Sequence, residues 1–309
     1  MITASLSAHD VALPDWAIAR FTGAAELDWP RLNVTRAEFG FAEGGELAVQ
    51  GGWDFEAKEL RAAVAEGIVR PSLVARWLPA TVKFESITLA AKARGPLTAL
   101  VHEGTGRVTG LIVAKLQPLT ADVTWRGNGA AITLKEARVQ AGASAITVAG
   151  TVDATGARLA TAKLSQGGVV RLALVHPAPV RWSPALAIGP LEFAGDDASL
   201  RVAATAGATG RLTIAARGIP SAWLADFVRV PGPDWRLVAL AAEGDWDRGP
   251  ATFKADGELA VALGAERLAT VALKVHGDPQ GVQIEALRVA EGATPIVTAT
   301  GRLPVTLHP

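Results

Sequence analysis

Hydrophobic residues alternate with polar or small residues along most of this 309-residue chain. In the stretch LAVQGGWDF, for example, Leu47, Val49 and Trp53 alternate with Gln50 and Asp54. Successive side chains of a β-strand point to opposite faces of the sheet, so a period of two predicts strands with one apolar face and one polar face. The same alternation recurs as far as Leu303, and we therefore expect strands to fill most of the chain.

The segments between these strands predict how the strands are connected. They contain ARGP, RGNG, AGDD, ATGR and HGDPQG, which favour tight reversals over crossover helices. Two segments differ, because apolar residues recur at helical spacing after Pro71 and again after Pro220. The predicted fold class is all-β, with a mainly antiparallel sheet and one short helix in each repeated unit.

Parts of the sequence recur at a nearly constant offset. RVQAGASAI at 138–146 shares its Arg-Val-x-x-Gly-Ala-x-x-Ile frame with RVAEGATPI at 288–296, Gly127 matches Gly277, and Pro71-Ser72 matches Pro220-Ser221. Self-similarity at a fixed offset is typical of duplicated units. We expect a partial leading repeat at 1–36, one β-repeat unit at 37–152, connecting strands at 153–189 and a second unit at 190–309.

Composition argues against several classes of protein. The 30 basic and 30 acidic residues balance and do not cluster as a phosphate-binding surface requires, so nucleic acid is not an expected partner. Without cysteine there can be no disulfide and no thiolate metal site. The unbroken apolar runs are far shorter than a membrane-spanning helix, and the N-terminus lacks the pattern of a signal peptide.

We found no pattern that indicates catalysis. The five histidines form no metal-binding pair, and we expect His102 and His276 to lie in solvated loops or at strand ends. The acidic pairs Asp196-Asp197 and Asp245/Asp247 stand in turn-like contexts, where Asp is common for backbone reasons. No nucleophile elbow or Walker loop is present. We therefore expect a protein that is not an enzyme and has no cofactor or metal.

An apolar sheet face must be covered by something, and the sequence leaves two possibilities open. A second sheet could pack against it, or it could remain an open, aliphatic trough, since the chain has only 8 Phe and no Tyr. Each candidate lining residue could equally pack against its neighbours. The candidates are Leu47, Val49, Val82, Phe84, Val123, Val148, Val202, Ile214 and Val261.

The short helix after Pro, the strand runs with spaced glycines and the closing ATGRLPVTL together resemble the TamB-like and AsmA-like proteins of bacterial envelopes. Repeats in that family often include a Gly-x-Leu-Pro strand start, matched here by Gly301-Arg302-Leu303-Pro304. The likeness extends over roughly residues 37 to 309.

This resemblance implies a long, curled β-sheet, called a β-groove or β-taco, with an apolar inner groove. It implies a periplasmic role in phospholipid transport between membranes or in outer-membrane assembly. The partners would be phospholipid acyl chains and an outer-membrane barrel protein. Full-length family members are longer and carry a membrane anchor, so we expect this chain to be a segment of a longer one. The alternative function is a self-packed β-repeat scaffold or an adhesin-like module that binds protein.

Overall fold

The structure is a computed structural model that describes residues 1–12, 16–79, 81–113, 116–228, 232–264 and 267–305. These residues form two compact units, one of residues 1–141 with 147–154 and the other of residues 142–146 with 155–309. Nearly all secondary structure is β, which confirms the predicted class. The leading segment 1–36 lies in unit 1, and the connecting segment 153–189 lies almost entirely in unit 2.

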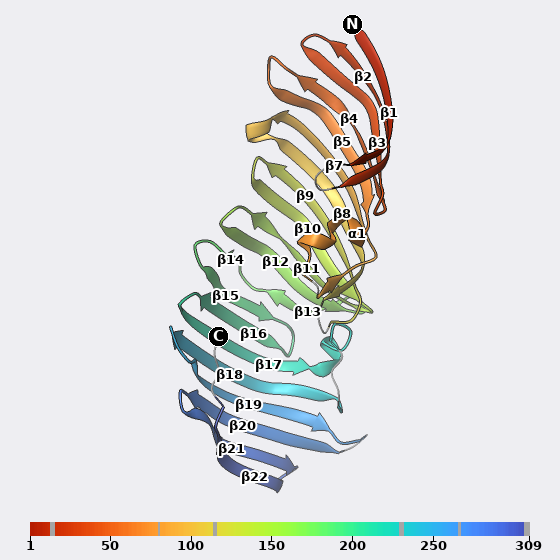
Figure 1. The fold of residues 1–309 in the computed structure, drawn as a ribbon. Helices are drawn as coiled ribbons and strands as arrows, with labels where there is room; N and C mark the ends of the chain where they lie inside the picture. Colours follow the sequence, from red (N-terminus) through yellow and green to blue (C-terminus); the bar gives the residue numbers. More distant parts are fainter. Residues whose placement is uncertain (13–15, 80, 114–115, 229–231, 265–266, 306–309) are drawn as a thin grey trace. The chain divides into compact units, whose positions relative to one another are not determined.

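Unit 1 is an antiparallel sheet in which most strands pair with the strands before and after them in sequence (Figure 1). A two-residue strand, β6, pairs with the end of β8. The strands are β1 (Ile2–Ala12), β2 (Ala17–Asp28), β3 (Arg31–Phe41), β4 (Gly45–Asp54), β5 (Glu59–Val69), β6 (Val82–Lys83), β7 (Ser86–Pro96), β8 (Val101–Val113), β9 (Leu119–Asn128) and β10 (Ala131–Ala141).

Unit 2 is also antiparallel, and β12 pairs there with both β13 and β14, which in turn pair with β15. From β15 onward each strand pairs with the next. The strands are β12 (Gly156–Gln166), β13 (Val169–Leu174), β14 (Ala178–Arg181), β15 (Leu186–Ala194), β16 (Ser199–Ala206), β17 (Thr209–Pro220), β18 (Trp235–Asp247), β19 (Thr252–Ala262), β20 (Leu268–Asp278), β21 (Gly281–Glu291) and β22 (Thr294–Leu303). Strand β11 (Ser144–Val152) has residues in both units.

The two Pro-Ser segments fold differently from each other. The first forms the four-residue helix α1 (Pro71–Val74) and the 3-10 turn η1 (Ala75–Trp77), with Pro71 at the helix start. The second forms only the 3-10 turn η3 (Ser221–Trp223), followed by irregular turns. Below about twelve residues a helix is marginal without tertiary support, so a similar sequence pattern can end as a helix or as a turn. The remaining short helix, η2 (Leu97–Ala99), joins β7 to β8.

The turn after η3 is fixed in unit 2 by polar contacts. The Ser144 hydroxyl, which is fully buried, donates to the Asp226 carboxylate at 2.7 Å. Gln166 donates from its side-chain amide to the Ala222 carbonyl at 2.8 Å. A buried hydroxyl is costly unless it is hydrogen-bonded, so these contacts position the turn against the ends of the strands.

The residues that recur in the sequence fall on two hairpins with the same register. In the β9–β10 hairpin Ile132 pairs with Gly127, and in the β20–β21 hairpin Val282 pairs with Gly277. Each hairpin has a β-bulge at the corresponding place, with Lys135 as the extra residue in one and Glu285 in the other. A bulge changes which side of the sheet the following side chains point to. Because both hairpins have a bulge at the same position, their matching residues point to the same side of the sheet.

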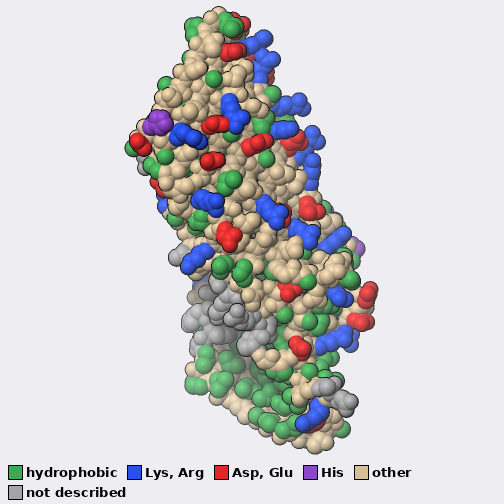
Figure 2. Space-filling view, turned by 90° about the vertical axis from the view of Figure 1, so that its right-hand side faces the viewer, with side chains coloured by type: hydrophobic (Ala, Val, Ile, Leu, Met, Phe, Trp, Pro, Cys, Tyr) green, Lys and Arg blue, Asp and Glu red, His purple; other side chains and the backbone are tan. Residues whose placement is uncertain are grey.

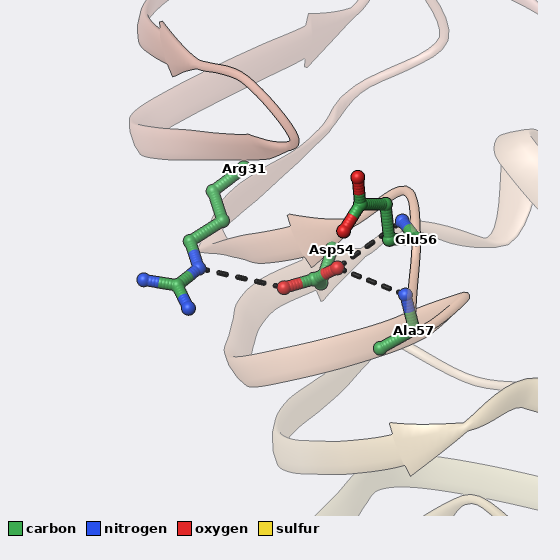
Figure 3. Close-up of polar contacts among 4 residues, drawn as sticks. All are labelled: Arg31, Asp54, Glu56 and Ala57. Atoms are coloured by element: carbon green, nitrogen blue, oxygen red, sulfur yellow. Dashed lines mark hydrogen bonds and ion pairs between the residues drawn. The ribbon is translucent and has the colours of Figure 1, made fainter.

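The hairpin tip between β4 and β5 is held by the carboxylate of Asp54 (Figure 3). One oxygen of Asp54 accepts hydrogen bonds from the backbone N–H of Ala57 at 3.0 Å and of Glu56 at 3.2 Å. The other accepts from Arg31 at 3.4 Å. The Ala57 hydrogen bond is the largest cause that lowers the pKa of Asp54 below its ordinary value, and the Arg31 guanidinium adds to it, while burial acts in the opposite direction.

We expect Asp54→Asn to destabilise unit 1 at neutral pH, because the amide keeps the acceptor geometry but loses the charge. A lowered folded pKa means that the stabilisation is present above the unfolded pKa of about 3.9 and is lost as pH falls through the folded value. Urea unfolding from pH 7 to pH 2.5 should therefore show the difference between the two proteins shrinking towards acid. A difference that stays constant over this range would contradict the role of the carboxylate.

Candidate functional site

The sheet of unit 1 has one apolar face, which the strand registers define. Side chains that are directly opposite each other on paired strands point to the same side, so each register continues the face across the sheet. One continuous row runs from Phe39 through Leu47, Gly67, Leu89 and Gly106 to Val123. We call this side the apolar face of unit 1, and its larger members are Phe21, Leu32, Phe39, Leu47, Val49, Trp53, Leu89, Val108, Val123, Trp125, Leu134 and Val139.

Unit 2 has an apolar face of the same kind. One row consists of Val202, Ile214, Ala242, Ala255, Val275 and Ile284, contributed by the consecutive strands from β16 to β21. Figure 2 shows hydrophobic side chains gathered over the last strands of the chain, at the bottom of the view, where the surface is hollowed. The apolar face of unit 2 includes Leu191, Phe193, Leu200, Val202, Leu212, Ile214, Leu237, Leu240, Phe253, Leu259, Val261, Val271, Leu273, Val275, Val282, Ile284, Leu287 and Val289.

The opposite face is polar and crossed by ion pairs between neighbouring strands. Arg107 pairs with Asp122 at 3.7 Å in unit 1. In unit 2 the pairs include Arg201 with Glu192 at 3.3 Å, Arg211 with Asp245 at 3.5 Å and Lys254 with Glu243 at 3.1 Å. Asp245 is thus a strand residue with an ion-pair partner. Exposed ion pairs of this kind contribute little stability each, and their main effect is to make one side of the sheet hydrophilic.

The apolar faces are not sealed by other parts of the described chain. Figure 1 shows each unit as a single layer of strands. In the interior of these faces Leu89 and Leu212 are each 36% exposed and Leu273 is 39% exposed.

Six of the nine predicted lining residues lie on these faces: Leu47, Val49, Val123, Val202, Ile214 and Val261. Val202 and Ile214 are directly opposite each other. Val148 lies on β11 and is half-buried.

The other two predicted residues lie in a different place. Val82 is on the short strand β6, which pairs only with the end of β8, and Phe84 follows it with 7% of its surface exposed. Leu73 in α1 and Leu119 at the start of β9 are also buried, and the chain order puts all three at the same end of the strands. Phe84 is thus closed to solvent in this structure and serves packing near the short helix.

His102 is the second residue of strand β8 and so lies at a strand end, as expected, and the register places it on the apolar face of unit 1. The Trp125 indole N–H donates to His102 Nδ1 at 3.1 Å, and His102 Nε2 lies 3.3 Å from the Gly129 carbonyl oxygen. The glycine-rich stretch after it, GTGRVTG at 104–110, is part of the same strand. The alternation of Gly104 and Gly106 is the sequence signal for a strand there, since alternate positions of a strand share one face.

His276 also lies near a strand end, where its Nδ1 is 2.9 Å from a Glu285 carboxylate oxygen. Lys274 also pairs with Glu285, at 2.8 Å. The hydrogen bond from Lys274 is the main reason why the pKa of Glu285 is lowered, and His276 adds to the effect. These three groups form an exposed ion-pair cluster, and Asp196 and Asp197 lie in the turn between β15 and β16.

The described residues were also searched for pockets, metal-binding clusters and membrane-spanning helices. Two shallow hollows of about 450 and 300 Å³ in unit 1 are lined in part by the charged side chains of Lys92 and Glu103. Among the residues that the structure covers, no group of three or more His, Asp or Glu side chains is placed to hold a metal ion. Within the same ranges no helix has the length and apolar character needed to cross a membrane.

Comparison with known proteins adds no family: no protein-family model, no curated protein and no solved structure matches the chain.

Matched leucine substitutions test the difference between the packed end and the open face of unit 1. We expect Leu119→Ala to cost about 2–5 kcal/mol in the free energy of unfolding, because Leu119 is 5% exposed and its removal leaves a cavity. Leu89→Ala should cost only about 1 kcal/mol, because its side chain is already partly in water and no enclosed cavity results. Urea unfolding of both variants measures the two values, and equal costs would show that the apolar face is packed like a core.

Proposed function

We propose that this chain is a non-catalytic lipid-binding protein whose apolar sheet faces hold the acyl chains of phospholipids. The observation that carries the proposal is the exposure of aliphatic side chains in the interior of each face, as at Leu89, Leu212 and Leu273. Each methylene group that moves from water onto such a surface contributes about 0.8 kcal/mol. A charged headgroup can remain in water at the open rim, so the ligand need not be fully enclosed.

The chemistry of the faces favours hydrocarbon over a protein partner. Interfaces that bind protein combine anchoring side chains with a polar rim and about one hydrogen bond per 100–200 Å². Here the faces consist mainly of Ala, Val, Leu, Ile and Gly, and the polar His102 already has hydrogen-bond partners at both ring nitrogens. A surface with few free hydrogen-bonding groups suits a hydrocarbon ligand, which forms no hydrogen bonds.

We infer that the two bulged hairpins derive from a duplication, as the recurring sequence suggests. The support is that the matching residues occupy the same register and the same bulge position in both hairpins. A duplicated sheet would extend the apolar surface in steps, which increases the length of hydrocarbon that one chain can hold.

The biological setting that we propose follows from the resemblance to TamB-like and AsmA-like proteins. It is phospholipid transport between membranes, or outer-membrane assembly, in the periplasm. An outer-membrane barrel protein is the proposed protein partner, and membrane attachment would be provided by other parts of a longer chain.

Mass spectrometry of organic extracts tests the binding proposal directly. Protein purified without detergent should release phospholipid or fatty acid, and the folded protein should bind a fluorescent fatty-acid analogue. We expect Ile214→Asp to weaken binding of this analogue at least tenfold, because a carboxylate would lie in the middle of the apolar face of unit 2.

Ala215→Asp is the matched control for this substitution. Ala215 is the next residue on the same strand, is exposed on the polar face and lies opposite Arg201, so the added charge is favourable there. The control should bind like the unmodified protein, and both variants should keep the β-sheet circular dichroism signal. If no lipid is recovered and Ile214→Asp unfolds the protein, the self-packed scaffold is the better description.

A further inference from the structure

Aromatic rings on the apolar faces extend over glycine residues. A Cβ atom built on each of these glycines would fall less than 3 Å from atoms of the ring, which real Cβ atoms essentially never do. Each ring therefore occupies the space that a side chain at the glycine would take. The pairs are Phe21 over Gly23, His102 over Gly127, Trp125 over Gly104, Trp246 over Gly210 and Phe253 over Gly277.

In four of these five pairs, the ring and the glycine are directly opposite each other on neighbouring strands. His102 pairs with Gly127 between β8 and β9, and Phe253 pairs with Gly277 between β19 and β20. Both glycines are buried although they lie on open faces, because the ring covers them. The ring therefore extends across the sheet, from its own strand over the next one.

The two glycines are also the ones that match each other in the sequence, 150 residues apart. The residues that cover them differ in kind, since one is a histidine and the other a phenylalanine. What recurs is an aromatic ring that extends over a glycine on the neighbouring strand. Polar atoms of the rings are also satisfied in this position, because the Trp246 indole N–H donates to the Gly207 carbonyl at 3.1 Å.

The position of the ring decides how far it projects from the apolar face, and therefore what can bind there. Two packed sheets are about 10 Å apart, so an aromatic side chain that stands up from one sheet reaches about half of that height. In unit 2, Phe253 belongs to a row that continues through Gly277 to Val282, and a ring standing there would project across the row. Lying over Gly277, the ring instead adds apolar area at the level of its aliphatic neighbours.

We propose that the glycines opposite these rings are positioning residues that keep the apolar face level, so that an extended, unbranched acyl chain can lie across several strands. This inference rests on the proposed lipid-binding function and names a structural feature that such binding requires. The glycine provides no contact of its own; it allows the ring to lie down. The ligand class that a level face suits is a linear hydrocarbon chain, which gains contact with each strand that it crosses.

The pair Phe253 and Gly277 gives a clean experiment, because the three atoms nearest to a Cβ at position 277 all belong to the Phe253 ring. We expect Gly277→Ala to push the ring up and to weaken binding of a fluorescent fatty-acid analogue about tenfold. Tenfold corresponds to about 1.4 kcal/mol, or the contact of about two methylene groups. Adding Phe253→Ala to Gly277→Ala removes the raised ring and should restore most of the binding.

Gly249→Ala is the control, because Gly249 lies in the turn between β18 and β19, outside the apolar face, and a Cβ there comes no nearer than 3.7 Å to another atom, the Asp247 carbonyl oxygen. It should bind like the unmodified protein. A merely structural role for Gly277 predicts lost stability that Phe253→Ala does not rescue, and that outcome overturns the inference, as does unchanged binding by Gly277→Ala. If the unmodified protein does not bind the analogue at all, the proposed function itself fails.

Discussion

The structure depends on hydrogen bonding between neighbouring strands, because among the described residues of either unit no second layer buries the apolar face. In most β-proteins of this length the hydrophobic effect acts mainly between two packed sheets. Here the available contributions are strand pairing, contacts between side chains that are opposite each other and the small packed region that contains Leu73, Phe84 and Leu119. An apolar surface left open in this way is energetically unfavourable in water, and a bound hydrocarbon would remove that cost.

Much of the fold can be read from the sequence, because the period of side chains along a strand is a direct geometric property of the strand. The alternation around Leu47 predicts β4, and the turn sequences predict antiparallel neighbours. The helix expected after Pro220 is only a 3-10 turn in the structure, since that segment is too short for its sequence to decide between a helix and a turn. Whether a helix forms in such a segment depends on what packs against it.

Part of the candidate site could also be predicted from the alternation of side chains along the strands. Residues in the middle of long strands, such as Val49 and Ile214, fall on the apolar faces as alternation requires. Phe84 does not, because it follows β6, which is only two residues long, so the alternation there is not continued across a sheet. The rings over glycine need knowledge of which residues are opposite each other, and register between strands is set by turns and bulges, which the period of the side chains does not reveal. The position of the His102 ring over Gly127 could not be predicted for that reason, since the two residues are 25 positions apart in the sequence.

The pairing of strands that follow one another in sequence has a consequence for how this chain acquires its structure. From β15 to β22 every new strand needs only the strand just before it as a template. Contacts are therefore local along the polypeptide, which lowers the entropy lost in loop closure and speeds folding relative to β-proteins built from distant pairings. Assembly of the sheet becomes close to a one-dimensional process in which a hairpin nucleates and further strands are added in order, as in solenoid proteins.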